Sequence, residues 1–306
     1  MNVLIIGLGS IAIKHIAALR KIEPSVCIFA LRSSQITNSL VDVQNVFSLD
    51  SLPVKPDFVI ISNPTSLHEE TIKQCLSLQC PLFIEKPVLS DITNTEILSE
   101  EFRRKNVISY VACNMRFHPS LIFLKDYLLT SQPRINEVSV YCGSYLPEWR
   151  PSRDFRLSYS VKSEMGGGAH LDLVHELDYC YWLFGTPQKI NACKTNVSSL
   201  NIEAVDAAYY QLMYPDFVAN ISLNYFRRDS RRDIEIVSED DTLFVDLLAN
   251  KITAKKRGTL LHETSFQIGD TYEKQMRYFI SKITKQESTD NSFDDGVEVL
   301  KIVLHD

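Results

Sequence analysis

The chain has 306 residues, of which 45% are hydrophobic and 23% charged, and its formal net charge is −6 at pH 7. This length favours two domains, and the composition is that of an ordinary globular protein. The acidic balance argues against a general affinity for nucleic acid or anionic membranes, because both need a basic face. The 7 cysteines have irregular spacings and no C-x-x-C pair, so we expect free thiols in a reducing, cytoplasmic setting.

The opening residues MNVLIIGLGS are apolar but lack a basic leader, and glycines interrupt them early. We therefore expect a strand there rather than a signal peptide. The chain has no stretch of ~18 uninterrupted apolar residues, so no membrane span is expected.

Short apolar segments alternate with helical segments over the first 120 residues. The expected strands are residues 2–6, 26–31, 58–62, 81–84 and 107–112. Apolar strands without internal alternation, separated by amphipathic helices, are typical of a parallel sheet covered on both faces. Residues 1–120 are therefore predicted to form an α/β, doubly wound Rossmann domain.

From residue 121 onward, inward and outward residues alternate along successive segments. Six such segments lie between residues 135 and 250, and most follow one another without a helix. We expect residues 121–306 to form an α+β domain with a large open, mainly antiparallel sheet. Helices are expected at 170–183, 272–285 and 294–304, the last of them packing back on the first domain. The basic segments FRRDSRRDIEI and AKKRG are interpreted as solvated turns between strands.

A glycine turn, GLGSIA at 7–12, follows the first expected strand and opens the first helix. Gly7 permits a tight turn, and Gly9 lets the backbone approach a pyrophosphate. The helix start at Ser10 and Ile11 supplies amide donors and the positive end of a dipole. This context predicts a dinucleotide site, with a glycine turn that binds no ligand as the alternative.

The second expected strand ends in Arg32, Ser33 and Ser34, where sites for NAD usually carry an acid. A guanidinium beside two hydroxyls suits a 2′-phosphate. NADP is therefore the expected cofactor. NAD is the alternative if Arg32 is a surface residue of a polar turn.

Several motifs occur in one fixed order along the chain. They are the glycine turn with His15, NPTSLH at 63–68, EKP at 85–87, NMRFHP at 114–119, WR at 149–150 and GGGAHLDLVHELDYCYWLFG at 166–185. Together they resemble the Gfo/Idh/MocA oxidoreductases over nearly the whole chain. The resemblance implies an NAD(P)-binding Rossmann domain followed by an open-sheet domain. It also implies hydride transfer to or from a hydroxyl-bearing carbon, usually of a sugar, inositol or nucleotide-sugar.

The same resemblance implies roles for particular residues. Glu85 and Lys86 are placed at the nicotinamide ribose, with Lys86 towards the substrate, and Pro87 is expected to follow a cis peptide bond. Arg116 is placed at the substrate. The other cofactor contacts that the resemblance implies are Asn63, Pro64, Thr65, His68, Asn114, Trp149 and Arg150.

Lys86 directly follows the carboxyl end of an expected strand, the edge at which open α/β sheets bind ligands. An ammonium there can donate a hydrogen bond to the hydroxyl that becomes a carbonyl and stabilise its developing negative charge. The alternative is a solvated loop lysine paired with Glu85.

Asp172 and His175 follow the glycines at a spacing of three, which places them on one face of the expected helix. Oxidation of an alcohol needs a base, and a histidine beside a carboxylate suits that role near neutral pH. We interpret His175 as the proton-transfer residue and Asp172 as its partner and a substrate anchor. Many family members place the aspartate four residues before the histidine, so this chain departs from the pattern. The alternatives are a first-turn acid and a core histidine, and no metal is expected because one helix cannot aim four ligands at one ion.

The segment SYLPEWRPSRDFRLSYSVKSEM is rich in arginine and aromatic residues. Its arginines can receive a carboxylate or phosphate, and its aromatic rings can stack on a sugar or simply pack. Surface salt bridges are the alternative for the arginines. The run resembles a subgroup from surface-glycan clusters that make sialic-acid-like sugars, which implies an acidic or nucleotide-linked sugar. The candidate substrate residues here are Tyr145, Trp149, Arg150, Arg153, Arg156 and Tyr159.

These features favour an NAD(P)-dependent dehydrogenase or reductase acting on a sugar, with Lys86 and His175 at the reacting oxygen. A second hypothesis is an epimerase, lyase or glycosidase that uses a tightly bound NAD transiently. A third is an NADP-binding regulator without turnover, although a regulator does not need Lys86, Asp172 and His175 together. An uncovered sheet face needs a partner, so a homodimer or homotetramer through the open sheet is expected.

Overall fold

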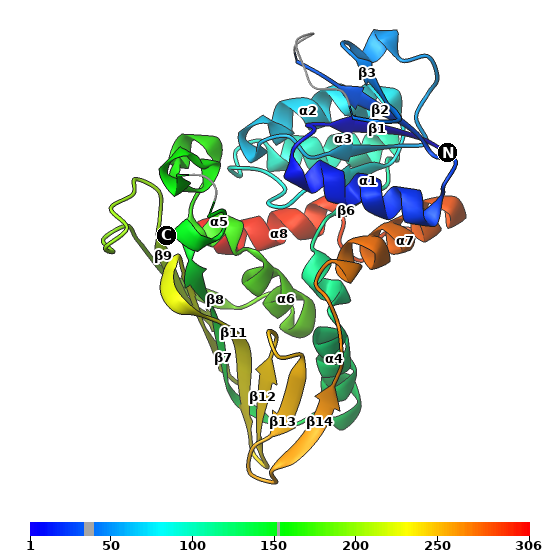
Figure 1. Ribbon diagram of the computed structural model, residues 1–306. Helices are drawn as coiled ribbons and strands as arrows, with labels where there is room; N and C mark the ends of the chain where they lie inside the picture. Colours follow the sequence, from blue (N-terminus) through cyan, green and yellow to red (C-terminus); the bar gives the residue numbers. More distant parts are fainter. Residues whose placement is uncertain (34–39, 152–153) are drawn as a thin grey trace. The chain divides into compact units, whose positions relative to one another are not determined.

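The computed structural model describes residues 1–33, 40–151 and 154–306, which divide into two compact units. The first unit contains Met1–Asn114 and Ile268–Leu300, and the second contains Met115–Gln267 and Lys301–Asp306. Each unit is built on one β-sheet (Figure 1). Within the described ranges, no helix combines the length and the apolar character that a membrane crossing requires.

The first unit holds a six-stranded parallel sheet with the order β3-β2-β1-β4-β5-β6. Its strands are β1 (Asn2–Ile6), β2 (Cys27–Leu31), β3 (Val43–Val46), β4 (Phe58–Ile61), β5 (Leu82–Ile84) and β6 (Ser109–Val111). The predicted Rossmann topology is confirmed. Strand β3 is not among the predicted strands, because its four residues VQNV include only two apolar side chains.

Helices complete the strand–helix alternation of the first unit. They are α1 (Ser10–Ile22), α2 (His68–Cys75), α3 (Thr95–Lys105), α7 (Asp270–Lys285) and the greater part of α8 (Phe293–Leu304). Helices α1 and α7 pack side by side (Figure 1). Strand β4 is fully buried along its length, as a strand covered on both faces must be.

The second unit holds an eight-stranded sheet with the order β14-β13-β12-β11-β7-β10-β9-β8. Its strands are β7 (Ile135–Tyr145), β8 (Lys189–Thr195), β9 (Ala207–Met213), β10 (Val218–Asn224), β11 (Phe226–Ser238), β12 (Thr242–Asp246), β13 (Lys251–Ala254) and β14 (Thr259–Glu263). The predicted mainly antiparallel sheet is confirmed. Strands β7 and β10 form its parallel pair. That pairing joins segments more than 70 residues apart and leaves no local signal in the sequence.

The helices of the second unit are α4 (Pro119–Ser131), α5 (Ala169–Asp172) and α6 (His175–Phe184). Residues 301–304, at the end of α8, also belong to this unit. The prediction of one helix over 170–183 is wrong. The backbone leaves the helical path at Leu173, where ψ is 29°, and a new helix begins at His175. Asp172 and His175 therefore lie on two helices and not on one helical face.

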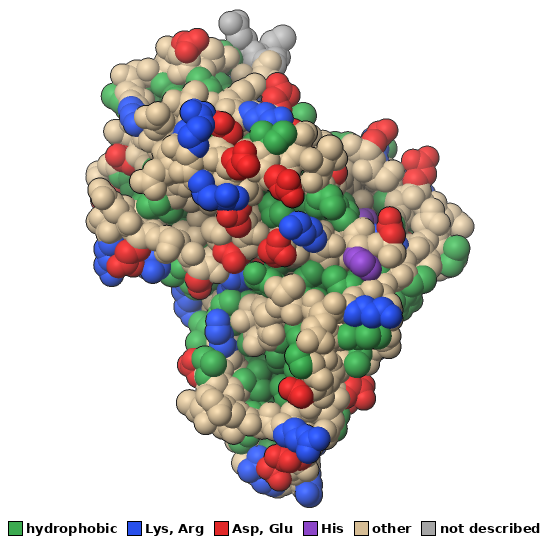
Figure 2. Space-filling model, turned by 180° about the vertical axis from the view of Figure 1, so that it is seen from behind, with side chains coloured by type: hydrophobic (Ala, Val, Ile, Leu, Met, Phe, Trp, Pro, Cys, Tyr) green, Lys and Arg blue, Asp and Glu red, His purple; other side chains and the backbone are tan. Residues whose placement is uncertain are grey.

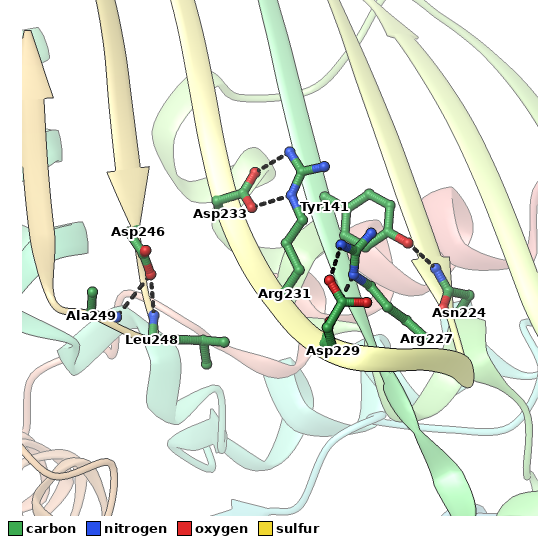
Figure 3. Close-up of polar contacts among 9 residues, drawn as sticks. All are labelled: Tyr141, Asn224, Arg227, Asp229, Arg231, Asp233, Asp246, Leu248 and Ala249. Atoms are coloured by element: carbon green, nitrogen blue, oxygen red, sulfur yellow. Dashed lines mark hydrogen bonds and ion pairs between the residues drawn. The ribbon is translucent and has the colours of Figure 1, made fainter. Parts of the chain in front are cut away.

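The segment FRRDSRRDIEI is a strand, not the predicted turn, because it lies within β11. Arg227 forms an ion pair with Asp229, and Arg231 with Asp233 (Figure 3). The guanidinium carbons of Arg227 and Arg231 also lie 5.0 and 4.6 Å from the centroid of the Tyr141 ring. These partners neutralise the arginines within the sheet. The AKKRG run does form a turn, between β13 and β14.

We predict that Gly296→Ala destabilises the first unit. A Cβ atom at Gly296, in α8, would lie 2.7 Å from Cγ2 of Val111 and 3.2 Å from Cβ of Val88. Both neighbours are β-branched, so their rotation is restricted and the extra methyl overpacks the site, at a cost of roughly 1–3 kcal/mol. Urea denaturation measures this difference.

Gly269→Ala is the matched control for that experiment. A Cβ atom there would meet no other atom within 4 Å, and the backbone has φ −58° and ψ −30°, which alanine adopts readily. This variant should keep or raise stability, by up to about 1 kcal/mol. Equal denaturation midpoints for the two variants would contradict the close packing of α8 on β6.

Candidate functional site

The glycine turn joins β1 to α1 with a geometry that only glycine fits at its first position. Gly7 has φ +86°, and a Cβ atom there would lie 2.4 Å from the backbone N of Asn63. Gly9 is the N-cap of α1, and a Cβ atom there would meet no protein atom within 4 Å. The first turn of a helix, here starting at Ser10 and Ile11, leaves amide donors without partners in the helix. Open space and free donors together fit a pyrophosphate.

A buried hydrogen bond connects α1 to the end of β5. His15 is fully buried, and its Nε2 lies 2.6 Å from Oε1 of Glu85. The other oxygen of Glu85 accepts a hydrogen bond from the backbone N of Lys86. The His15 ring packs edge-on against the rings of Phe83 and Tyr272, at centroid distances of 4.9 and 5.9 Å. The helix that carries the glycine turn is therefore tied to the residue next to Lys86.

Three adjacent strands bring the motifs of the first unit to one edge of its sheet. In the parallel register Ile6 pairs with Ile61, and Ile61 pairs with Ile84. Gly7, Asn63 and Glu85 consequently follow the carboxyl ends of neighbouring strands. Lys86 is half-buried at this edge, and the predicted cis peptide bond before Pro87 is confirmed.

The NPTSLH segment is held to this edge by its histidine. His68 is buried, and its two ring nitrogens lie 3.0 and 3.1 Å from the carbonyl oxygens of Asn63 and Val88. Burial lowers the pKa of His68. The Asn63 side chain donates to the hydroxyl of Thr71. His68 thus joins the loops after β4 and β5, while Pro64 is exposed and Thr65 half-buried at the start of a short 3₁₀ turn.

Arg32, at the end of β2, has a guanidinium group that can donate a further hydrogen bond. The backbone N of Arg32 donates to the carbonyl of Val46, and its side chain is half-buried. Its Nη1 is buried without a hydrogen-bond partner among the described residues. A buried donor without a partner is unfavourable, so a bound anion would stabilise it. Ser33 is exposed, and Ser34 lies outside the described residues.

In the NMRFHP motif, two predicted site residues contact protein groups within their own units. Asn114 is 6% exposed, and its side-chain amide donates to the hydroxyl of Thr271 at 2.7 Å. The Arg116 guanidinium forms a buried bidentate ion pair with the Asp178 carboxylate, at 2.8 and 3.0 Å. Leaving Asp178 without this partner would strand a buried charge, so Arg116 has a structural role in the second unit.

In the second unit, Asp172 ends α5 and His175 begins α6. Asp172 is 7% exposed, and its carboxylate accepts hydrogen bonds from the hydroxyls of Tyr159 and Tyr225. His175 is half-buried. Tyr225 is not among the predicted site residues, because a single tyrosine after a strand belongs to no recognisable motif.

The aromatic residues of the predicted substrate segment pack on the end of the sheet. The Trp149 indole donates to the Ser144 hydroxyl at 2.8 Å, and its ring lies edge-on to Tyr225 at 5.3 Å. The Tyr145 ring lies beneath the guanidinium of Arg228, with 3.6 Å between the guanidinium carbon and the ring centroid. Trp149 is 39% exposed, so one part of its ring remains accessible.

The arginines of this segment differ in their surroundings. Arg156 is exposed and lies 3.6 Å from Asp154, two residues earlier. Arg150 is exposed and forms no ion pair with any described residue. Arg153 lies outside the described residues. In the part of the chain that the structure covers, no three His, Cys, Asp or Glu side chains are grouped to hold a metal ion.

Comparison with protein families gives two matches. Residues 1–113 match the model described as an oxidoreductase family with an NAD-binding Rossmann fold, and residues 133–244 match the Gfo/Idh/MocA C-terminal domain. The two matches together cover most of the chain.

Comparison with curated proteins gives relatives of low identity. A scyllo-inositol 2-dehydrogenase (NADP(+)) of Bacillus subtilis is 26% identical over 190 residues, which are 61% of this chain and 51% of the relative. A levoglucosan dehydrogenase of Pseudarthrobacter phenanthrenivorans is 26% identical over 172 residues, which are 56% of this chain and 43% of the relative. The matched part thus spans about half the length of these curated relatives.

Solved structures show the same fold over almost the whole chain. The UDP-N-acetylglucosamine 3-dehydrogenase of Acidithiobacillus ferrooxidans has a TM-score of 0.80 at 19% identity, covering 99% of this chain and 95% of that one. The WlbA dehydrogenase of Chromobacterium violaceum, solved with NADH and UDP-GlcNAcA, has a TM-score of 0.83 at 17% identity, covering 99% and 92%. At such identities the likeness establishes the fold.

We predict that Gly9→Ala weakens cofactor binding and leaves folding intact. The added methyl meets no protein atom but occupies the space that a pyrophosphate would approach. The dissociation constant for the dinucleotide should rise at least tenfold with an unchanged melting temperature, as measured by calorimetry and circular dichroism. Gly7→Ala is the contrasting variant, because its positive φ and its contact with Asn63 make alanine unfavourable for folding itself. Undiminished cofactor affinity in Gly9→Ala would exclude this turn as the pyrophosphate site.

Proposed function

The chain belongs to the Gfo/Idh/MocA family of oxidoreductases, and we propose that it transfers a hydride between a bound nicotinamide cofactor and a hydroxyl-bearing carbon of a sugar or sugar derivative. The observation that carries this proposal is the buried hydrogen bond from His15 to Glu85. It connects the helix of the glycine turn to the residue beside Lys86. A dehydrogenase needs a dinucleotide site and a reactive group at the nicotinamide end in a fixed relation, and this contact supports both.

The proposed chemistry divides between the cofactor and the protein. The nicotinamide, when bound, accepts or gives the hydride. Lys86 donates a hydrogen bond to the reacting oxygen and stabilises its negative charge. His175 takes or returns the hydroxyl proton, and Asp172 supports the charged form of the imidazole. These roles follow from the residue types and from the family motifs in which the residues stand.

We propose NADP as the preferred cofactor. Arg32 follows β2 where an acid would select NAD, and its Nη1 lacks a partner among the described residues. A 2′-phosphate would supply the missing acceptor. One relative is named as an NADP(+) enzyme, whereas the WlbA structure contains NADH, so the choice rests on this chain's own residues.

We propose an acidic or nucleotide-linked sugar as the substrate. The relatives include dehydrogenases of inositol and levoglucosan, and the structural neighbours include a UDP-N-acetylglucosamine dehydrogenase. Arg150 supports the acidic choice, because it is exposed and forms no ion pair with any described residue. A guanidinium in that position suits a carboxylate or phosphate.

We further propose that the protein is a cytoplasmic homodimer or homotetramer assembled through the open face of the second sheet. Helix α5 contacts β9 and β10, whereas Tyr209 on β9 is 42% exposed. A second copy would cover that exposed face. On the face that Figure 2 shows, acidic and basic side chains are interspersed, which supports a small-molecule substrate rather than nucleic acid. The seven free cysteines suit a reducing compartment.

Lys86→Ala and His175→Ala should each lower kcat by about 10²- to 10⁴-fold while the cofactor still binds, because each removes a group that acts on the reacting oxygen. The assay follows reduced nicotinamide with a panel of inositols, simple sugars and UDP-linked sugars. Lys55→Ala, which changes an exposed lysine of the first unit, is the control for Lys86→Ala. Full activity in either variant would refute its assigned role. Substrate conversion without net change in reduced nicotinamide would instead indicate a transient-redox enzyme.

Arg32→Asp should raise the dissociation constant of NADPH about 10- to 100-fold and leave that of NADH nearly unchanged. The substitution removes a charged hydrogen bond to the 2′-phosphate and places a like charge there, whereas NADH lacks this phosphate. Fluorescence titration with both dinucleotides measures the ratio, and NADH serves as the internal control. Equal weakening of both would remove the case for a 2′-phosphate site.

A further inference from the structure

Two tyrosines donate to the two oxygens of the buried Asp172 carboxylate. Tyr159 donates to Oδ1 at 2.5 Å, and Tyr225 donates to Oδ2 at 2.6 Å. Each oxygen of the carboxylate thus accepts one hydrogen bond from a phenol. Neither phenol has a part in the reaction proposed above.

Tyr225 is a rigid donor. It lies between β10 and β11 and is fully buried. Its backbone N donates to the carbonyl of Asp206, and its own carbonyl accepts from Leu146. Its ring packs edge-on against Trp149. Backbone and ring are thus both held, which fixes the position of the hydroxyl.

Tyr159 reaches Asp172 because of the glycine run. It begins a short 3₁₀ turn, Tyr159–Val161, whose backbone passes close to Gly167. A Cβ atom at Gly167 would lie 2.2 Å from the carbonyl oxygen of Tyr159. A side chain there would push the turn away, and the phenol with it. The Tyr159 residue is 39% exposed although its hydroxyl contacts a buried carboxylate.

We propose that Tyr159 and Tyr225 are positioning residues that hold the Asp172 carboxylate in the orientation in which it acts as the partner of His175, an inference that rests on the proposed function.

The physical reason is the cost of a buried negative charge. A carboxylate removed from water favours its neutral form unless donors stabilise the ionised one. Burial and the neighbouring Asp172 charge raise the pKa of both tyrosines, so each phenol keeps its proton and remains a donor. One donor on each oxygen also fixes the plane of the carboxylate, which a single hydrogen bond would leave free to turn.

The test uses Tyr159→Phe and Tyr225→Phe, which remove a hydroxyl and keep the ring. Each should lower kcat/KM about tenfold and move the acid limb of its pH profile upward by about one unit. The limb moves upward because a carboxylate that loses a hydrogen-bond donor takes up a proton more readily, and proton transfer in the proposed reaction depends on this carboxylate. The dissociation constant of the dinucleotide should not change. Since the Tyr159 ring is partly exposed, Tyr159→Phe tests the proposal without disturbing the core.

Tyr210→Phe is the matched control, because Tyr210 on β9 is a buried phenol of the same unit that donates to the carbonyl of Val303 at 2.8 Å. Tyr210→Phe should lower the melting temperature about as much as the two Asp172-linked variants do, and it should leave the pH profile unchanged. An acid limb that stays unmoved in both Asp172-linked variants, as in Tyr210→Phe, would overturn this inference alone. Turnover that survives His175→Ala would overturn the proposed function and this inference with it.

Discussion

A buried hydrogen bond between the His15 ring and the Glu85 carboxylate holds together the functional edge of the first unit. Taking a carboxylate out of water is unfavourable unless its oxygens find donors. Glu85 is 8% exposed, and its two oxygens lie against the His15 ring and the Lys86 backbone N. Separating α1 from the end of β5 would leave Oε1 of Glu85 buried without its hydrogen-bond partner. The glycine turn and Lys86 therefore keep a fixed relation, because His15 and Glu85 hold their segments together although they are 70 residues apart in the sequence.

The second unit applies the same constraint at Asp172. There the donors are phenols, one from the junction of two strands and one from a turn that the glycine run admits. Phenols serve where a lysine or arginine would not, because they stabilise the carboxylate without cancelling its charge. An uncancelled charge is what a partner of a proton-accepting histidine must have. The glycine run thus permits the close approach of the turn that carries Tyr159.

Local patterns predict the first unit well, because parallel strands buried on both faces appear as apolar runs and the glycine turn marks their first helix. The short β3 escapes, since two of its four residues are polar. The break at Leu173 also escapes, because residues 169–180 are buried except for His175, so no change of pattern marks the break. Pairings over long separations, such as β7 with β10 or Arg116 with Asp178, depend on tertiary packing. The motifs identify candidate side chains, but partners such as Tyr225 become visible only in the fold.

Ion pairs within the second unit already engage some of the arginines that could bind an acidic substrate. Arg116 is buried and bidentate with Asp178, so a substrate anion would compete with a contact that the fold itself needs. Arg156 lies near Asp154 in an exposed turn, where pairing is weak. Arg150 is exposed and has no carboxylate partner among the described residues. An anionic substrate group bound to Arg150 would therefore displace none of the ion pairs that the described part of the second unit contains.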